Sequence, residues 1–287
     1  MKKILSRGYK GIKTIFGGYG LEKFYPIRII HNFILRHLKS DFAVVQGHKM
    51  FLDSNDSLNL SVYGIHEEFE TELVKKEIKP GDVVLDIGAN IGYYTLIFAK
   101  LVGENGRVFA FEPDPTNFAL LKRNVEINGY KNVVLIQKAV SNKSGKLRLY
   151  LSENNKGDHR IYNSHDGRKF IDIESVKLDD YFNHNVKIDF IKMDIQGAEG
   201  GAIQGMSKLL EKNVSVKIIS EFWPAGLKRF GIEPIAYLKL LLRHGFKLYE
   251  LNEKKKKLDL VDIAKLLETY TIEKDNHTNL LCIRMGF

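Results

Sequence analysis

The chain has 287 residues, of which 44% are hydrophobic, and it carries a formal net charge of +9. This length accommodates one large α/β domain with an appendage and does not require two full domains. No apolar segment approaches the roughly 20 residues that cross a bilayer, and the single cysteine, Cys282, cannot form an internal disulfide. We therefore expect a cytoplasmic protein that is neither threaded through a membrane nor exported.

The positive charge is concentrated in residues 1–40, which hold six lysines, three arginines and one glutamate, a net charge of +8. The remaining residues together carry +1, which argues against a basic nucleic-acid groove over the whole protein. Apolar residues recur at helical spacing in "ILSRGYKGIKTIF" and "PIRIIHNFILRHL", with basic residues between them. Two alternatives stay open: a helical layer packed on the main domain, or a contact with an anionic partner such as a membrane surface, which would make the protein peripheral there.

We predict an N-terminal basic helical extension over residues 1–75 and a main domain over residues 76–287. In the main domain, β-rich runs alternate with helical periodicity, which predicts an α/β fold with a parallel sheet. The predicted strands are "VVLDI", "RVFAFE", "NVVLIQKAV", "IDFIKMD", "VSVKIISEF", "FKLYEL" and "NLLCIRM". An insertion at about residues 141–185 adds the strand-like runs "KLRLYLS" and "KFIDIESV" around a polar loop.

The stretch "LDIGANIG" predicts a glycine turn between a strand and a helix. The strand ends at Asp86 and Ile87, and Gly88 and Gly92 would let the backbone approach a ligand without interference from Cβ atoms. The next strand ends at Glu112, and the carboxyl ends of strands in a doubly wound sheet are where nucleotide-like ligands bind. A carboxylate there would accept hydrogen bonds from both hydroxyls of a ribose.

These residues favour S-adenosylmethionine over a dinucleotide. A dinucleotide would need G-x-G-x-x-G to hold its pyrophosphate, whereas here three residues separate Gly88 from Gly92. Asp86 would repel a phosphate, but it suits a cationic ligand. S-adenosylmethionine carries an ammonium and a sulfonium and has no phosphate, so it is the predicted cofactor.

Four motifs in order, "DVVLDIGANIGYYTLIFAK", "FAFEPDPTNFALLKRNVEINGYKNV", "VKLDDYF" and "IDFIKMDIQGAE", resemble those of the FkbM family of class I methyltransferases. The resemblance covers roughly residues 64–285. It implies a doubly wound, Rossmann-like sheet of seven strands whose last strand inserts antiparallel. It also implies S-adenosylmethionine as the methyl donor and O-methylation of a hydroxyl on a sugar, a glycan or a related natural product. One departure is Gln196, where many members have glutamate, so no acid role is expected there.

The resemblance assigns binding roles by position. At the methionine end of S-adenosylmethionine it places Asp86, Gly88, Asn90 and, from the segment "YGIHEEFETELV", Glu67; Glu112 holds the ribose, and Ala139, Val140 and Ser141 border the adenine.

Methyl transfer to an aliphatic hydroxyl needs a group that removes the proton or lowers the hydroxyl pKa. Asp194, at the end of "IDFIKMD", is the leading candidate, and the alternative is that it caps the following helix. Glu199 and Glu221 also follow strand ends and are weaker candidates. We expect Lys192, inside the same strand, to pair with a carboxylate.

Two histidines of the insertion loop, His159 and His165, are further candidates for the general base, because an imidazole titrates near neutral pH. Asp194, Glu199 and Glu221 would supply the oxygen ligands that magnesium prefers. No compact ligand spacing demands a metal, so a metal-dependent reaction is not favoured.

The expected acceptor is a small molecule or a lipid-linked glycan. The main alternative is an RNA methyltransferase, because "LKRNVEINGYKNV" recurs in that broader class. Against it, "MDIQGAE" lacks the D-P-P-aromatic element expected for methylation of an exocyclic amine, and the basic charge is confined to one segment. A third alternative is a catalytically silent S-adenosylmethionine-binding module, although Asp86, Glu112 and Asp194 argue against it.

Overall fold

The computed structural model describes residues 40–153, 155–182 and 186–284, and the chain divides into two compact units, residues 1–66 and 67–287. The basic amphipathic helices predicted before residue 40 lie outside the described residues. The described part of the first unit holds a β-hairpin, β1 (Phe42–Val45) and β2 (His48–Phe51), and the short helix α3 (Leu60–Tyr63). This hairpin lies within the predicted helical extension and was not predicted from the sequence.

The hairpin turn is made by Gln46 and Gly47, which both have positive φ angles, 51° and 84°. Two consecutive residues of this kind suit a two-residue hairpin because their twist matches that of the flanking strands. The side chain of Asp56 then accepts hydrogen bonds from the N–H groups of Leu60 (2.8 Å) and Ser61 (3.1 Å), which satisfies free amides at the start of α3.

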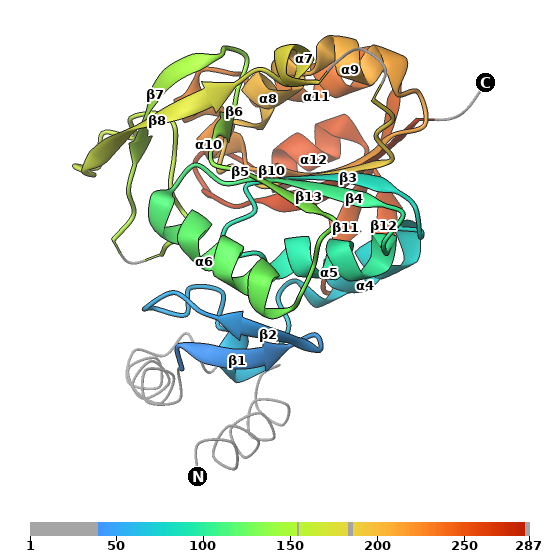
Figure 1. Cartoon of the computed structure of the whole chain (residues 1–287). Helices are drawn as coiled ribbons and strands as arrows, with labels where there is room; N and C mark the ends of the chain where they lie inside the picture. Colours follow the sequence, from blue (N-terminus) through green and yellow to red (C-terminus); the bar gives the residue numbers. More distant parts are fainter. Residues whose placement is uncertain (1–39, 154, 183–185, 285–287) are drawn as a thin grey trace. The chain divides into compact units, whose positions relative to one another are not determined.

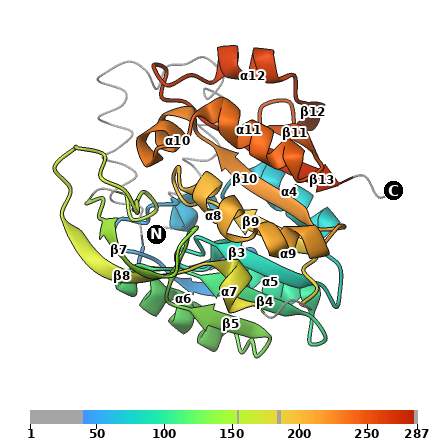
Figure 2. The same ribbon diagram turned by 90° about the horizontal axis from the view of Figure 1, so that it is seen from above.

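The second unit is built on an eight-stranded sheet with the order β12-β11-β13-β10-β9-β3-β4-β5 (Figures 1 and 2). Neighbours from β10 to β5 are parallel, whereas β13 runs antiparallel between β10 and β11. Seven strands thus form the predicted sheet with its antiparallel last strand, and β12 adds a further edge strand. The strands are β3 (Val83–Ile87), β4 (Arg107–Phe111), β5 (Val133–Ile136), β9 (Phe190–Met193), β10 (Lys217–Phe222), β11 (Phe246–Asn252), β12 (Lys257–Leu260) and β13 (Thr278–Arg284).

Helices cover both faces of this sheet, which makes the fold doubly wound. One face is covered by α4 (Glu68–Glu77), α5 (Tyr93–Val102) and α6 (Pro115–Ile127) (Figure 1). On the other face lie α7 (Leu178–Tyr181), α8 (Glu199–Gly205), α9 (Ser207–Lys212) and α11 (Pro234–Arg243) (Figure 2). The remaining helices are α10 (Pro224–Phe230) and α12 (Ile263–Thr269). Across the described residues, no helix has the length and apolarity needed to cross a bilayer.

The predicted insertion forms a small sheet of its own, with the order β6-β8-β7. Its strands are β6 (Ala139–Val140), β7 (Gly145–Tyr150) and β8 (Phe170–Val176), and Leu149 and Ile173 pack with Ala139 in a separate apolar cluster. The two strands predicted from sequence are therefore confirmed. The polar loop between β7 and β8 therefore joins two paired strands of this small sheet.

The start of α6, the helix that follows β4, is determined by local sequence. Asp114 accepts hydrogen bonds from the N–H groups of Thr116 (3.0 Å) and Asn117 (2.8 Å), and Pro115 occupies the first helical position of α6. Both features are typical of a helix start. They hold the segment after Glu112 in place, at the carboxyl edge where β3, β9 and β10 also end.

Candidate active site

The turn after β3 is shaped by contact with the turn after β9. Gly88 has φ +84°, and a Cβ added there would lie 2.1 Å from the backbone oxygen of Asp194. The N–H of Asp194 in turn donates to the carbonyl of Ile87 at 3.1 Å. Glycine is required at this position because the turns after β3 and β9 are in contact here. The sequence had suggested a different reason for the glycine, close approach of the backbone to a ligand.

Asp86 lies in the sheet with only 2% of its surface exposed. It accepts a hydrogen bond from Thr95 Oγ1 on α5 at 2.5 Å, and burial raises its pKa to about 6. It is paired in register with Lys192 of β9, so the two side chains project on the same face of the sheet. A buried acid with a titration near neutrality is a candidate for a functional site.

Glu112 is the second buried acid of the turn region. Its Oε2 accepts from the N–H of Asn90 and its Oε1 from the N–H of Asp114, both at 2.8 Å. Burial raises its pKa to about 8 despite these two hydrogen bonds. An oxygen of a carboxyl group can accept more than one hydrogen bond, so Glu112 retains acceptor capacity for a ligand. The acid therefore orders the turn after β3 and joins it to the start of α6.

Asn90 has a positive φ of 50°, and its side-chain Oδ1 is buried without a hydrogen-bond partner in the described part of the chain. An unpaired buried acceptor is costly, so such an atom needs an explanation in a native structure. Its position on the turn that precedes α5 fits a ligand that donates a hydrogen bond there.

Lys192 forms the centre of a buried ion cluster. Its Nζ lies 3.2 Å from Glu70 Oε1 and 3.8 Å from Asp194 Oδ2, and 4.5 Å from the centroid of the Tyr94 ring. Burial disfavours its charge, but the carboxylates of Glu70 and Asp194 outweigh this and raise its pKa. The predicted pairing of Lys192 with a carboxylate is confirmed. Glu70 itself, fully buried and close to Glu67, has its pKa raised to about 8, which the nearby Lys192 partly offsets.

Glu67 connects this cluster to the last strand. It accepts from Tyr94 Oη at 3.2 Å and from Asn279 Nδ2 at 3.0 Å, and Asn279 also donates to Glu70 at 2.5 Å. Asn279 lies on β13. It was not predicted as a site residue, because the stretch "NLLCIRM" indicates only a strand. Its role depends on pairing across more than two hundred residues.

Asp194 is the accessible acid at the end of β9, with 34% of its side chain exposed. Its Oδ1 accepts from Gln196 Nε2 at 2.8 Å. The alternative that it caps the next helix is wrong, because α8 begins at Glu199 after Ala198 and has no side-chain cap. The Asp194 side chain therefore does not cap α8 and is partly open to solvent.

Glu199 and Glu221 are buried beside this acid. Glu199 Oε1 accepts from the N–H groups of Ile195 (3.0 Å) and Gly197 (3.2 Å), so it orders the turn after β9. Burial raises its pKa to about 7, and burial followed by repulsion from Asp194 and Glu199 raises that of Glu221 well above its ordinary value. The described residues contain no group of three or more His, Cys, Asp or Glu side chains that could hold a metal ion.

The two predicted histidines lie in different surroundings. The side chain of His159 is 7% exposed, its Nδ1 accepts from the N–H of Ser152 at 3.0 Å, and its Nε2 lies 3.9 Å from Asp114 Oδ2. Burial lowers its pKa, which Asp114 partly opposes. These contacts place His159 beside the turn after β4. His165 is exposed, and its N–H donates to Asn163 Oδ1.

The loop between β7 and β8 contacts α6 and the turn after β9. Asn117 Nδ2 donates to the carbonyl of Lys156 at 2.9 Å, which ties the loop to α6. Tyr162 Oη donates to the carbonyl of Gln196 at 2.7 Å, which ties it to the turn after β9. Tyr162 was not identified from sequence, since nothing local distinguishes it from other loop tyrosines.

The segment predicted to border adenine is held by the small sheet. Ala139 and Val140 form β6, and the N–H of Ser141 donates to the carbonyl of Val176 at 3.0 Å. Gly205 of α8 packs on the backbone of Ser141, where an added Cβ would lie 2.1 Å from its oxygen. All three residues of the segment are buried, with at most 5% of each exposed.

The sheet has the strand order of the class I methyltransferase fold, because β13 lies antiparallel between β10 and β11 beside a row of parallel strands. Buried acids at the ends of β3 and β4 agree with this fold. A family model for the methyltransferase FkbM domain matches residues 86–248. The chain belongs to this family, and the family predicted from its motifs is confirmed.

Curated relatives match parts of the chain. The 2-O-methyltransferase NoeI of Sinorhizobium fredii is 30% identical over 152 residues, which cover 47% of this chain and 61% of that protein. The 31-O-demethyl-FK506 methyltransferase FkbM of Streptomyces tacrolimicus is 44% identical over 73 residues, covering 25% of this chain and 27% of that protein. The chain thus spans less than two thirds of the length of either relative.

Among solved structures, a SAM-dependent O-methyltransferase of Thermotoga maritima aligns with a TM-score of 0.43 at 14% identity, over 78% of this chain and 67% of that chain. An rRNA methylase of Streptococcus thermophilus aligns with a TM-score of 0.43 at 13% identity, over 76% and 95% of the two chains. The fold is assigned from the strand order β12-β11-β13-β10-β9-β3-β4-β5 and not from these two alignments.

Proposed function

We propose that this protein is an S-adenosylmethionine-dependent O-methyltransferase that acts on a hydroxyl of a sugar, a glycan or a related natural product. The main support for the proposal is a pair of buried acids at the turn that precedes α5. Asp86 lies at the end of β3, before the turn, and Glu112 follows β4 and accepts a hydrogen bond from the turn. The names of the two relatives, a 2-O-methyltransferase and a methyltransferase acting on demethylated FK506, support a hydroxyl acceptor.

The residues at the turn fit S-adenosylmethionine in charge and in hydrogen bonding. Asp86 and Glu67 would face the positively charged methionine end, with the unpaired Oδ1 of Asn90 accepting a hydrogen bond there. Glu112 would accept hydrogen bonds from the ribose hydroxyls, and the segment from Ala139 to Ser141 would border the adenine. When bound, S-adenosylmethionine supplies an electrophilic methyl group.

The chain would contribute alignment and a proton acceptor. In-line transfer requires the acceptor oxygen, the methyl carbon and the sulfur to be held on one axis, and positioning of this kind can lower a barrier by several kcal/mol. We assign proton removal to Asp194, because it is the acid at the ends of β9 and β10 whose side chain is substantially exposed, whereas Glu199 and Glu221 are buried. The Lys192 Nζ lies 3.8 Å from Asp194 Oδ2.

Calorimetry with S-adenosylhomocysteine tests the cofactor assignment. Replacement of Glu112 by Ala removes the proposed hydrogen bond to the ribose and leaves the N–H groups of Asn90 and Asp114 without their acceptor, so the dissociation constant should rise by about tenfold or more, corresponding to about 1.5–3 kcal/mol. Glu104→Ala, which changes an exposed acid of equal charge, serves as the control. A parent protein that does not bind S-adenosylhomocysteine, or a Glu112→Ala variant within twofold of the parent, would contradict the assignment.

A further inference from the structure

The loop between β7 and β8 is packed against the helix that follows β10. The Arg160 guanidinium lies 4.7 Å from the centroid of the Trp223 ring, immediately before α10. The Tyr162 ring packs edge-on against Phe230, the last residue of α10, with 6.0 Å between the ring centroids. Arg160 and Tyr162 each have only 8% of their surface exposed. This part of the loop is therefore held in place by side-chain packing.

From this position Tyr162 fixes the backbone of the turn after β9. Its Oη donates to the carbonyl of Gln196 at 2.7 Å. Gln196 has a φ of 56°, in the left-handed region that residues other than glycine rarely adopt, and Gly197 follows with a φ of 99°. On the opposite side, Glu199 accepts from the N–H groups of Ile195 (3.0 Å) and Gly197 (3.2 Å). Contacts on both sides thus maintain the unusual conformation of Gln196.

The side chain of Gln196 reaches Asp194. Its Nε2 donates to Asp194 Oδ1 at 2.8 Å. The NH₂ group of the amide faces Asp194 because an ionised carboxylate accepts hydrogen bonds and has none to donate. The other oxygen, Oδ2, lies 3.8 Å from Lys192 Nζ. Each oxygen of Asp194 therefore has a different neighbour in the protein, and the two contacts together restrict rotation of a side chain that is 34% exposed.

The orientation of a general base decides how well it works. A base must come within about 2.6–3.2 Å of the atom whose proton it removes, and a misplacement of about 1 Å can lower the rate on the order of 100-fold. Without the Gln196 donor, the Asp194 carboxylate would keep its charge and gain access to other rotamers. Without the Tyr162 hydroxyl, the carbonyl of Gln196 would lose the hydrogen bond that ties it to the loop.

We propose that Gln196 and Tyr162 are positioning residues for methyl transfer. Gln196 orients the Asp194 carboxylate toward the acceptor hydroxyl, and Tyr162 holds Gln196 in the conformation that allows this. The proposal rests on the proposed function, because it assumes that Asp194 removes the proton. It gives the loop between β7 and β8 a part in turnover that requires no contact between Tyr162 and the acceptor.

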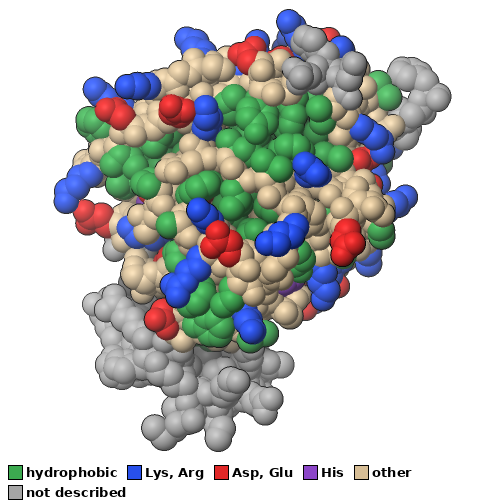
Figure 3. Space-filling model, viewed as in Figure 1, with side chains coloured by type: hydrophobic (Ala, Val, Ile, Leu, Met, Phe, Trp, Pro, Cys, Tyr) green, Lys and Arg blue, Asp and Glu red, His purple; other side chains and the backbone are tan. Residues whose placement is uncertain are grey.

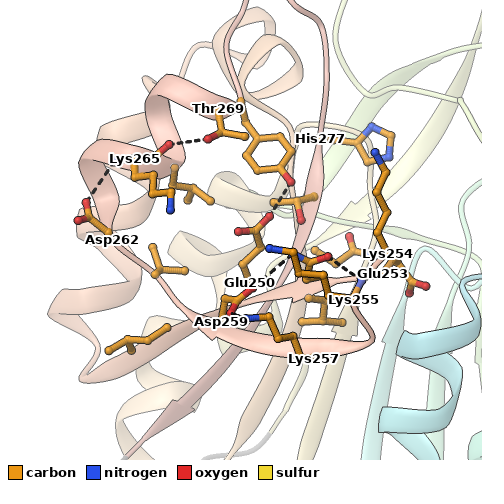
Figure 4. Close-up of a pocket in the computed structure, with 18 of the residues that line it drawn as sticks. Glu250, Glu253, Lys254, Lys255, Lys257, Asp259, Asp262, Lys265, Thr269 and His277 are labelled. Carbon is orange, nitrogen blue, oxygen red and sulfur yellow. Dashed lines mark hydrogen bonds and ion pairs between the residues drawn. The ribbon is translucent and has the colours of Figure 1, made fainter.

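The connection between β11 and β13 offers a matched control for the loss of a tyrosine hydroxyl. Residues 253–277 form an elaboration after β11, consisting of β12, α12 and loops, beside a cavity of about 740 Å³ (Figure 4). Glu253 anchors it by accepting from two N–H groups in the first turn of α4, at 3.1 and 3.0 Å. Tyr270 Oη donates to Glu250 at 2.6 Å in the lining of this cavity. Tyr270→Phe therefore removes a hydrogen bond of the same kind at a different site.

Transfer of a radioactive methyl group from S-adenosylmethionine to methyl fucoside, methyl glucoside or methyl mannoside tests the proposal in the full chain. With the sugar that the parent methylates fastest, Tyr162→Phe and Gln196→Met should each lower kcat by at least about fivefold. The KM for the sugar and the affinity for S-adenosylhomocysteine should stay within twofold, as expected for an interaction used only in the transition state. Tyr270→Phe should keep kcat within twofold, and thermal unfolding verifies that each variant is folded.

A double-mutant cycle with Asp194→Asn separates positioning from a general structural role. If Tyr162 and Gln196 act through Asp194, adding Tyr162→Phe or Gln196→Met to Asp194→Asn should change kcat by less than twofold. The full loss in that background, or an unchanged kcat in both single variants, would overturn the proposal. A parent that methylates none of the three sugars, or an unchanged kcat in Asp194→Asn, would contradict the proposed function. A low kcat in Asp194→Asn with normal Tyr162→Phe and Gln196→Met variants contradicts only this inference.

Discussion

Asp194 combines an exposed carboxylate with a neighbouring cation. Replacement by Asn keeps the size and the hydrogen bond with Gln196 but removes the proton acceptor. We expect kcat to fall by at least about tenfold, with the affinity for S-adenosylhomocysteine within twofold of the parent. Steady-state kinetics and calorimetry measure the two effects. Asp172→Asn, on an exposed position of β8, is the control, and an unchanged kcat in Asp194→Asn would leave Asp194 with a structural role only.

We expect the buried ion pair between Lys192 and Glu70 to affect the free energy of unfolding. Lys192→Met would leave the Glu70 carboxyl fully buried without its cation, which typically costs about 3–5 kcal/mol. Lys192→Met/Glu70→Gln removes both charges, so it should recover part of that loss. Urea unfolding of the parent, both single variants and the double variant gives the coupling energy. Additive effects would show that the pair contributes little.

Buried acids also predict how stability depends on pH. Burial raises the pKa of Glu112 to about 8 in the folded protein, above its ordinary value of 4.5. The folded state then holds a proton that the unfolded chain releases, so stability is lost as pH rises from about 5 to about 8, by up to about 1.4 kcal/mol per pH unit. Unfolding of the ligand-free protein in urea at pH 6 and pH 8 measures this loss. Glu112→Gln should reduce the difference, and an unchanged difference would contradict the pKa shift.

At the level of elements, the contact between the turns after β3 and β9 depends on Gly88. Gly88→Ala combines a positive φ with a Cβ that would lie 2.1 Å from the Asp194 oxygen, so we expect a loss of about 3 kcal/mol or more. Gly129→Ala is the control, because its φ is +73° and nothing lies within 4 Å of the added Cβ. It should cost only about 1–2 kcal/mol. Thermal unfolding of both variants tests the difference, and equal losses would rule out the steric contact as the cause.

The sequence was sufficient to predict the elements with strong local signals. The seven main strands have continuous apolar runs, and the turn after β3 has glycines at fixed spacing, so the order of elements and the positions of Asp86 and Glu112 followed from local pattern. β12 was missed because "KLDL" is short and begins at the last of four consecutive lysines, a run that indicates a solvated turn. The hairpin of β1 and β2 was missed because the helical pattern before residue 40 was extended too far.

Parts of the site that depend on distant pairing were not predictable in this way. Asn279 reaches Glu67 only because β13 inserts beside β10, and Glu253 reaches α4 only because of the elaboration after β11. Their residue types give no signal in isolation, since asparagine in a strand and glutamate in a turn are both ordinary. A single sequence predicts which chemistry is available and does not predict which residues from remote segments complete it.

For the whole molecule, the distribution of charge leads to a prediction about residues 1–40. On the face shown in Figure 3, basic and acidic side chains of the described residues are interspersed, whereas residues 1–40 carry +8 of the net +9. We propose that this segment binds an anionic surface such as a membrane carrying lipid-linked acceptors, at about 1 kcal/mol per basic residue near the surface.

Co-sedimentation with vesicles containing anionic lipid measures this interaction for the full chain and for a chain that begins at Asp41. The full chain should bind at low salt and be released at high salt, because charges farther away than the Debye length are screened. The shortened chain should remain in solution, and the unfolding transition of each chain serves as the control for folding. Equal partitioning of both chains would favour the alternative, a helical layer packed on the main domain.

The insertion of β13 between β10 and β11 has a consequence for the order in which the protein can mature during synthesis. The hydrogen bond from Asn279 to Glu67 joins residues 212 positions apart, and β13 pairs on both sides. Until β13 leaves the ribosome, β10 and β11 each present an unpaired edge, which is a template for pairing with other chains. A nascent chain that stalls before residue 278 therefore has neither a complete site nor a closed sheet, and premature termination yields an aggregation-prone product rather than a partly active one.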